Sequence, residues 1–193
     1  EIWNLVFTQF DRSADGKLSP LPKPNIDTGM GLERLTAVIQ GVYSNYDTDL
    51  FKDLISRVEA LCEKRYGEDE KQDVSFRVIS DHARAAAFLI GDGIMPSNEG
   101  RGYVLRRIIR RAIRFGQALG LSDEFLYLIC RKVIEVMGTH FRELVQSKDL
   151  IEGVVSNEER RFSDTFHYSM RVLSDEIEEL KAKGNDTIPG ELA

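Results

Sequence analysis

Residues 27–34 read Asp-Thr-Gly-Met-Gly-Leu-Glu-Arg, and they join a β-type segment to a helical one. The two glycines stand where the backbone must turn tightly or allow a ligand to come close. From Leu32 onwards, apolar residues recur at helical spacing until Gly41, and glycine commonly ends helices. The stretch therefore predicts a strand that ends in a turn and continues as a short helix.

Charged side chains near the two ends of this stretch suggest a binding site. Asp27 at the strand end can hold a cation, such as a substrate ammonium group. Arg34 in the first helical turn can face a polyphosphate or stack on a base. An ordinary strand–helix turn, with a surface ion pair between Glu33 and Arg34, explains the same residues. The spacing alone leaves both interpretations open.

The segment before this turn has the composition of a hairpin. Residues 1–10 are rich in β-branched and aromatic residues, which predicts a buried strand whose Trp3 and Phe7 pack in a core. Residues 14–17 contain an Asp-Gly turn signal. Residues 20–24, Pro-Leu-Pro-Lys-Pro, predict an extended connector, because proline donates no hydrogen bond to a central strand. The chain opens within the strand pattern, so we expect a piece of a longer protein.

The pattern beyond Tyr46 is helical throughout. Ser156 and Glu159 have the spacing of a capping box at the start of the last helix, which Gly184 ends and in which Phe162 and Phe166 pack in the core. Asp47 or Thr48 is the predicted cap of the first helix after Tyr46, and the other predicted helices span about 74–90, about 102–118 and Ser122 to about 137. The fold class expected is α+β, mostly α, with short antiparallel strands in residues 1–43 and a helical bundle in 44–193.

The charge distribution separates a basic helix from an acidic remainder. The net charge of −6 argues against a nonspecific nucleic-acid binder, but a global sum hides local patches. Residues 101–114 hold six arginines and no acid, whereas residues 121–193 hold nine basic and fifteen acidic residues. The acidity therefore lies away from the arginine-rich stretch.

The arginines of this stretch need a partner. On a helix Arg106, Arg110 and Arg114 form one row, and Arg107 and Arg111 form the adjacent row. Closely spaced like charges repel, so phosphates of RNA or acids of another helix must neutralise them. Both partners stay open, the candidate acids being Glu158, Glu159 and residues 175–179. The predicted buried side of the helix consists of Val104, Leu105, Ile108, Ile109, Ala112 and Ile113.

Cysteine and histidine usage predicts no metal centre. Cys62 and Cys130 lie far apart in apolar helical stretches, which favours buried free thiols in a reducing compartment. The three histidines show no metal-ligand spacing with them, so we predict no zinc site. His82 beside Asp81 is more typical of a structural hydrogen bonder than of a catalyst. No apolar run reaches membrane-spanning length and no signal peptide is visible, so we expect a cytoplasmic protein without a membrane partner.

Residues 27–34 and the short helix after them resemble motif 3 of class II aminoacyl-tRNA synthetases, and their wording is similar to that of the alanyl-tRNA synthetases. The resemblance implies that Arg34, the candidate catalytic residue, contacts ATP beside Gly31. It also implies that Asp27 binds the amino group of alanine and that Gly29 leaves room for a methyl side chain.

Residues 1–4, Glu-Ile-Trp-Asn, resemble the same family. This resemblance implies that Glu1 lies near ATP-bound Mg²⁺ and that Asn4 faces alanine. Residues 1–43 would then be the C-terminal part of a class II catalytic core.

Residues 80–85, Ser-Asp-His-Ala-Arg-Ala, and residues 96–107 resemble the tRNA-recognition region of that family. The resemblance implies that loop residue Asn98 recognises a G·U wobble pair in the acceptor stem of tRNA-Ala. An Asn amide offers a donor and an acceptor to base edges in the wide minor groove of A-form RNA. The other tRNA-binding candidates are Arg84, Arg101, Arg106, Arg107, Arg110, Arg111 and Arg114.

The family implies a two-step reaction in which alanine is activated with ATP and Mg²⁺ and then transferred to tRNA-Ala. Motifs 1 and 2 and the zinc-binding editing domain of the family are not in this sequence, so we expect the chain alone to be inactive and to need the remainder of a parent enzyme. Two other classes of function stay open: a helical RNA-binding module without catalysis, and a structural domain whose arginines pair with its own acids.

Overall fold

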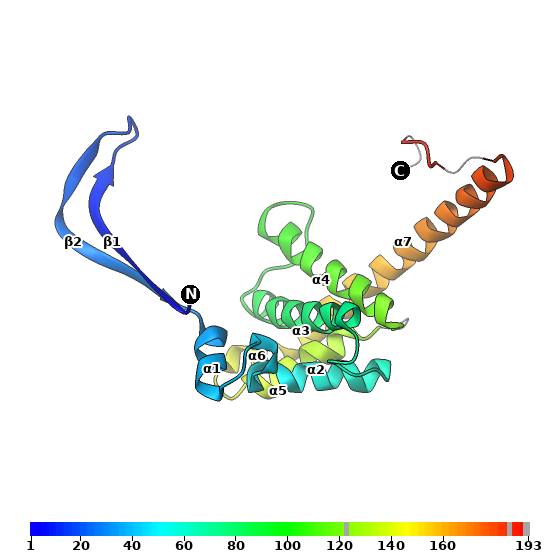
Figure 1. The fold of residues 1–193 in the computed structure, drawn as a ribbon, viewed down its shortest axis with the longest axis horizontal. Coiled ribbons are helices and arrows are strands. Elements are labelled where there is room, and N and C mark those ends of the chain that lie inside the picture. Colours follow the sequence, from blue (N-terminus) through cyan, green and yellow to red (C-terminus); the bar gives the residue numbers. More distant parts are fainter. Residues whose placement is uncertain (122–123, 185–186, 191–193) are drawn as a thin grey trace. The chain divides into compact units, whose positions relative to one another are not determined.

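The computed structural model describes residues 1–121, 124–184 and 187–190, and it divides into two compact units, Glu1–Lys52 and Asp53–Ala193. Two strands come first and helices follow (Figure 1). This order confirms the predicted α+β, mostly α class. In the described part of the chain, no helix is both long enough and apolar enough to cross a bilayer.

The first unit begins with an antiparallel hairpin. Strand β1 (Trp3–Arg12) pairs with β2 (Leu18–Met30), and the connecting turn includes Gly16 with φ of 83°. In the register, Asn4 lies opposite Gly29 and Val6 lies opposite Asp27. The hairpin predicted from the Asp-Gly turn is therefore confirmed.

Two predictions about these strands are wrong. Trp3 is 56% exposed and Phe7 is 65% exposed, because no described residue of the unit covers either face of the two-stranded ribbon. Residues 20–24 belong to β2 instead of forming a connector. Both strands of a two-stranded ribbon are edges, where proline is tolerated, and the register shifts between Thr8 and Phe10 opposite these prolines.

Helix α1 (Leu32–Gln40) follows directly and ends at Gly41, as predicted. Gly41 has φ of 68°, and its amide donates to Val38 O at 3.2 Å. A short 3-10 turn, η1 (Asn45–Asp47), leads to α2 (Asp49–Cys62). Helix α2 begins directly after Thr48, one of the two predicted cap residues, and the Lys52 amide donates to Thr48 O at 3.0 Å.

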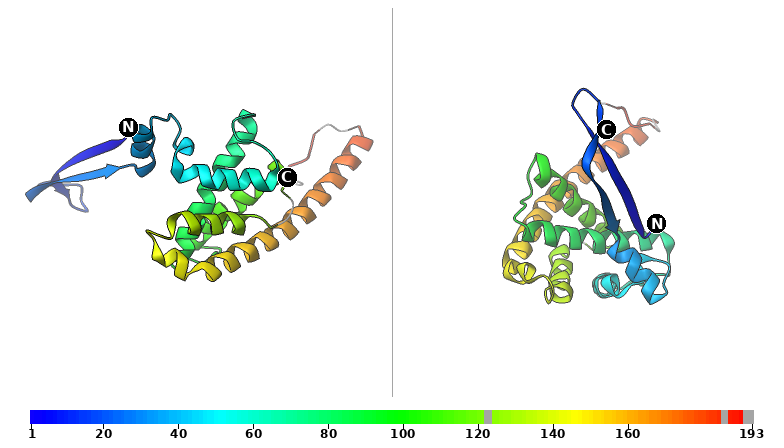
Figure 2. Two further views of the ribbon diagram at one scale, coloured as in Figure 1. Left: turned by 90° about the horizontal axis from the view of Figure 1, so that it is seen from below. Right: turned by 90° about the vertical axis from the view of Figure 1, so that its left-hand side faces the viewer.

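The second unit is a helical bundle. It contains most of α2 together with α3 (Glu70–Gly91), α4 (Gly100–Leu119), α5 (Leu126–Met137), α6 (Arg142–Gln146) and α7 (Lys148–Ala182). Helix α3 packs on α4 and α5, and α7 packs on the same two helices (Figure 2). The core lies among these four helices and includes Phe76, Ile79, Leu105, Ile109, Leu126, Ile129, Ile151 and Val155.

The capping box predicted at Ser156 is wrong. Helix α7 begins at Lys148, so Ser156 lies inside it and donates its hydroxyl hydrogen to the Glu124 carboxylate. Glu159 caps a different helix: its Oε1 accepts the amides of Phe125 at 2.9 Å and Leu126 at 3.1 Å, at the start of α5. The predicted start of that helix at Ser122 lies outside the described residues.

The second half of α7 extends beyond the other helices of its unit (Figure 1). Phe162 and Phe166 are half-buried with their rings 5.8 Å apart, so they mark the place where the helix leaves the core. Of the two thiols, both free, Cys130 is fully buried and Cys62 is half-buried. Burial raises the pKa of the Cys130 thiol.

The buried carboxyl group of Glu159 predicts a pH-dependent stability. Burial raises its pKa from 4.5 to about 7, although the Phe125 and Leu126 amides act in the opposite direction. The contribution of Glu159 to stability is complete below the pKa that this carboxyl group has in the unfolded state. It is lost as pH rises towards and through the folded-state pKa of about 7, because the folded state must then bury a charged carboxylate. We expect the free energy of unfolding to fall by roughly 2–3 kcal/mol between about pH 5 and pH 8.

Urea unfolding at both pH values measures this effect. Glu159→Gln is expected to remove most of the difference, whereas Glu178→Gln on the exposed surface of the same helix is expected to retain it. An unchanged pH dependence in the Glu159 variant would contradict the assignment.

Candidate functional sites

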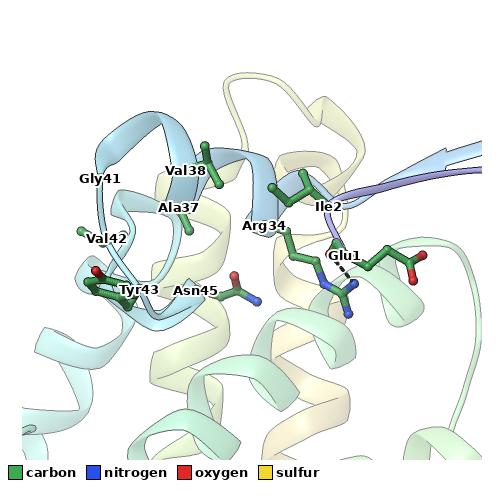
Figure 3. A pocket seen from close by; sticks show the side chains of 9 residues that line it. All are labelled: Glu1, Ile2, Arg34, Ala37, Val38, Gly41, Val42, Tyr43 and Asn45. Carbon is green, nitrogen blue, oxygen red and sulfur yellow. Dashed lines mark hydrogen bonds between the residues drawn. The ribbon is translucent and has the colours of Figure 1, made fainter.

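A pocket of about 470 Å³ lies at the base of the hairpin in the first unit (Figure 3). Arg34 extends from α1 beside the first residue of the chain, and its Nη1 donates to Glu1 O at 2.8 Å. The lining residues are Glu1, Ile2, Arg34, Ala37, Val38, Gly41, Val42, Tyr43 and Asn45. Four of them, at positions 34, 37, 38 and 41, follow helical spacing, so the sequence itself contains a signal for this part of the lining.

Three residues predicted to contact alanine share one face of the hairpin. Directly paired residues and every second residue along a strand lie on the same face, so Asn4, Gly29 and Asp27 lie together. Asn4 Nδ2 donates to Glu1 Oε1 at 2.8 Å, which links this face to Glu1. A Cβ at Gly29 would stand 3.7 Å from Asn4 Oδ1. Trp3 lies on the opposite face.

The structure brings only some of the residues predicted to contact ATP and alanine together in the pocket. Glu1 and Arg34 line the pocket, and Gly31 lets the Arg34 side chain lie close, since a Cβ there would be 3.3 Å from Arg34 Cδ. Asp27 and Gly29 lie outside the pocket lining. Among the described residues, none forms a hydrogen bond or ion pair with the Asp27 carboxylate, and no cluster of three metal-ligating side chains is present.

The second candidate site is the exposed side of α4. Arg101, Arg107, Arg111 and Arg114 are exposed there. The Arg107 guanidinium carbon lies 5.7 Å from the centre of the Tyr103 ring, and that of Arg111 lies 5.8 Å from the centre of the Phe115 ring. Aromatic rings one turn away thus support both side chains while their charges face solvent.

Two arginines of α4 pair with an acid inside the protein. Arg110 Nε donates to Glu158 Oε1 at 2.7 Å, and Arg106 Nε lies 3.2 Å from the same oxygen, without hydrogen-bond geometry. Glu158 is 4% exposed. Internal pairing, one of the two alternatives left open by the sequence, therefore accounts for part of the row.

A groove of about 450 Å³ runs along α3 and α4. Val104, predicted to be buried, is 54% exposed and lines this groove with Ile108. The prediction is wrong because α3 and α7 pack against the other edge of the apolar face of α4 and leave the edge with Val104 uncovered. The lining is completed by His82 and by three arginines, Arg107, Arg110 and Arg111.

His82 forms the local hydrogen bond expected of a structural residue. Its Nδ1 lies 2.9 Å from Asp81 Oδ2, and this hydrogen bond is the main reason that the pKa of Asp81 is lowered. Arg84, half-buried on the same helix, lowers it further through its charge.

The loop between α3 and α4 presents Asn98 at the end of the arginine-bearing helix. Asn98 is exposed, and its Oδ1 accepts a hydrogen bond from Arg106 Nη1. Arg106 Nη2 also donates to Pro96 O at 3.4 Å. A Cβ at Gly102 would overlap the Met95 carbonyl oxygen and the Ser97 side chain, so the loop rests directly on the helix backbone.

Comparison with known proteins identifies the family of the chain. Residues 1–193 match the family model described as tRNA synthetases class II (A). Proteins named Alanine--tRNA ligase are similar over the whole chain: those of Nitratidesulfovibrio vulgaris (53% identical over 193 residues) and Geobacillus kaustophilus (49% over 193 residues). The protein of that name from Desulfosudis oleivorans is 54% identical over 98% of the chain. The chain spans 22% of the length of each of these relatives. It belongs to the class II (A) tRNA synthetase family.

Proposed function

We propose that this chain is the part of an alanine–tRNA ligase that joins one side of the ATP and alanine site to the surface that holds the acceptor stem of tRNA-Ala. The observation that carries the proposal is the exposed arginine surface of α4 (Arg101, Arg107, Arg111 and Arg114) beside Asn98. Residues 1–43 supply the catalytic part and residues 44–193 supply tRNA recognition. Similarity to the ligases runs through both parts, which a helical RNA-binding module alone does not explain.

The first unit offers positioning and charge, and no nucleophilic side chain is needed. A carboxylate oxygen of alanine attacks the α-phosphorus of ATP, the bond to the bridging oxygen breaks, and pyrophosphate leaves. Arg34 at the hairpin base supplies positive charge for the phosphates. Mg²⁺, when bound, neutralises phosphate charge, and one carboxylate such as Glu1 together with phosphates is a typical ligand set for it.

Alanine would lie on the hairpin face of Asn4, Gly29 and Asp27. The Asp27 carboxylate has no hydrogen-bond or ion-pair partner in the part of the chain that the structure describes, so it suits the substrate ammonium group. Gly29 leaves the space that a side chain would otherwise fill, so a methyl group fits beside Asn4 Oδ1. The alanyl group then passes from the adenylate to the terminal ribose of tRNA.

In the second unit, the exposed arginines suit phosphates of the acceptor stem. Arginine forks bind phosphate in bidentate fashion. The side chains of Arg107 and Arg111 are pre-positioned by their aromatic neighbours, which reduces the entropy lost on binding. Asn98 at the end of the same surface can reach base edges in the minor groove.

A binding measurement tests this surface. The double variant Arg107→Gln/Arg111→Gln is expected to bind a tRNA-Ala acceptor-stem helix about 10- to 100-fold more weakly at low salt. The slope of log affinity against log salt is expected to decrease in magnitude by about two, one for each lost phosphate contact.

The matched control is Arg171→Gln on α7. Arg171 is also exposed and lies 5.7 Å from the centre of the Tyr168 ring, so it has the same local geometry away from α4. It is expected to leave affinity unchanged. Equal affinities of the double variant and the control would refute the RNA-binding role.

A further inference from the structure

Glu158 is a buried anchor for the arginine-bearing helix. It lies in α7, is 4% exposed, and its Oε1 approaches Arg110 Nε at 2.7 Å and Arg106 Nε at 3.2 Å. A buried carboxylate is costly unless it is paired, so both guanidinium groups are held at fixed positions. The Arg106 side chain is only 19% exposed, against 37% for Arg110. Arg106 is therefore poorly placed to meet a phosphate.

The other edge of the Arg106 guanidinium group holds the loop before α4. Nη1 donates to Asn98 Oδ1, and Nη2 donates to Pro96 O at 3.4 Å. The guanidinium group is planar and rigid, so it fixes these acceptors relative to Glu158. From the other side, Gly102 allows the loop to rest on the α4 backbone. The position of Asn98 thus depends on a residue sixty positions later in the sequence.

This contact also determines which end of the Asn98 amide is available. Arginine has donors and no acceptor, so the amide oxygen of Asn98 must face Arg106. The two N–H groups on Nδ2 then remain, and no described residue accepts a hydrogen bond from them. They suit hydrogen-bond acceptors of the minor groove, such as pyrimidine O2 and purine N3. A G·C pair offers the same kinds of acceptor, so a donor held at a fixed position distinguishes a G·U pair by the wobble displacement of uracil O2.

We propose that Arg106, anchored by Glu158, is a positioning residue that presents the Nδ2–H donor of Asn98 to the acceptor-stem base pair. The inference rests on the proposed function and adds to it a residue that controls specificity for the base pair. Arg106 contributes to discrimination between base pairs, and Arg107 contributes to affinity for phosphates.

The first test replaces the donor without removing the loop contact. Asn98→Asp keeps an oxygen towards Arg106 and substitutes an oxygen for Nδ2. Its readout is the ratio of affinities for two acceptor-stem helices that carry G·U or G·C at the pair in question. We expect wild-type preference of about 5- to 100-fold for G·U and a ratio near one for Asn98→Asp. Added repulsion from the new charge acts on both stems and cancels in the ratio. A retained preference would show that an acceptor reads the pair and would overturn the inference.

The second test loosens the loop and retains the charge. Lysine at position 106 can still pair with Glu158, but a single ammonium group cannot bridge Asn98, Pro96 and Glu158 in the same geometry. Arg106→Lys is expected to bring the ratio close to one with an unchanged salt dependence. Arg107→Gln, as the matched control, is expected to weaken binding to both stems equally and to leave the ratio unchanged.

Two further measurements keep the outcomes separate. Urea unfolding of Arg106→Lys checks that the bundle is intact, and Gly102→Ala displaces the loop with Arg106 still present, so it is expected to lower the ratio as well. A full preference in both variants would overturn the positioning role alone. No measurable binding of wild type to either stem would overturn the proposed function together with the inference.

Discussion

Replacing Arg34 by glutamine in the proposed full-length alanine–tRNA ligase is expected to lower alanine-dependent ATP–pyrophosphate exchange by about 10²- to 10³-fold. The Arg34 side chain lies in the pocket at the hairpin base, where its Nη1 also holds Glu1 O at 2.8 Å. Negative charge develops on the phosphates during adenylate formation, and a fixed guanidinium group stabilises it without reorganisation. Glutamine keeps a polar side chain but carries no charge.

Arg12→Gln is the matched control for this experiment. Arg12 is an exposed arginine of the same hairpin, located at the end of β1 next to the turn and outside the pocket lining. We expect it to retain exchange within about 2-fold. Exchange close to wild type in the Arg34 variant would remove Arg34 from the reaction. The isolated 193-residue chain is expected to give no exchange, because it spans 22% of the length of the relatives named Alanine--tRNA ligase.

Gly116→Ala is expected to destabilise the helical unit by about 2–3 kcal/mol. Gly116 is buried in α4, and a Cβ there would overlap the ring of Phe125. Phe125 is 3% exposed, and its amide donates to Glu159 Oε1 at 2.9 Å. The ring therefore cannot withdraw without disturbing the buried start of α5. The thermal midpoint is expected to fall by roughly 4–12 °C.

Gly153→Ala tests the same chemical change where space is open. Gly153 lies within α7, and a Cβ there would meet no neighbouring atom within 4 Å. Alanine is the better helix former, so the free energy of unfolding is expected to rise by up to about 1 kcal/mol, which raises the thermal midpoint by up to about 4 °C. Calorimetry on both variants gives the comparison. Similar midpoints for the two would show that the close contact with Phe125 is not a packing constraint.

The elements that could be predicted from the sequence are those specified by neighbours along the chain. Gly41 ends α1 because a left-handed residue is needed there, and the Asp-Gly turn closes the hairpin. Helix α3 begins at Glu70, earlier than the predicted start near 74, because the Asp69 side chain accepts the Lys71 amide at 2.9 Å. Even this difference has a local cause, although the apolar pattern alone did not reveal it.

The wrong predictions concern contacts between distant segments. Ser156 and Glu159 have the spacing of a capping box, but their partners are Glu124 and the start of α5. A spacing rule specifies which residues can cap a helix and says nothing about which helix is nearby. Val104 fits the apolar stripe of α4 yet lines an open groove, because burial depends on where α3 and α7 pack.

By itself the sequence determined the order of strands and helices, the ends of several of them, and the presence of a row of arginines on one helix, since these follow from periodicity and from residues three or four positions apart. Only the tertiary structure decided which arginines remain available to a ligand. Glu158 lies 48 positions beyond Arg110 and still pairs with both Arg110 and Arg106, whose side chain is only 19% exposed. Pairing of a buried charge depends on distance in space and on desolvation, and neither is encoded in local spacing.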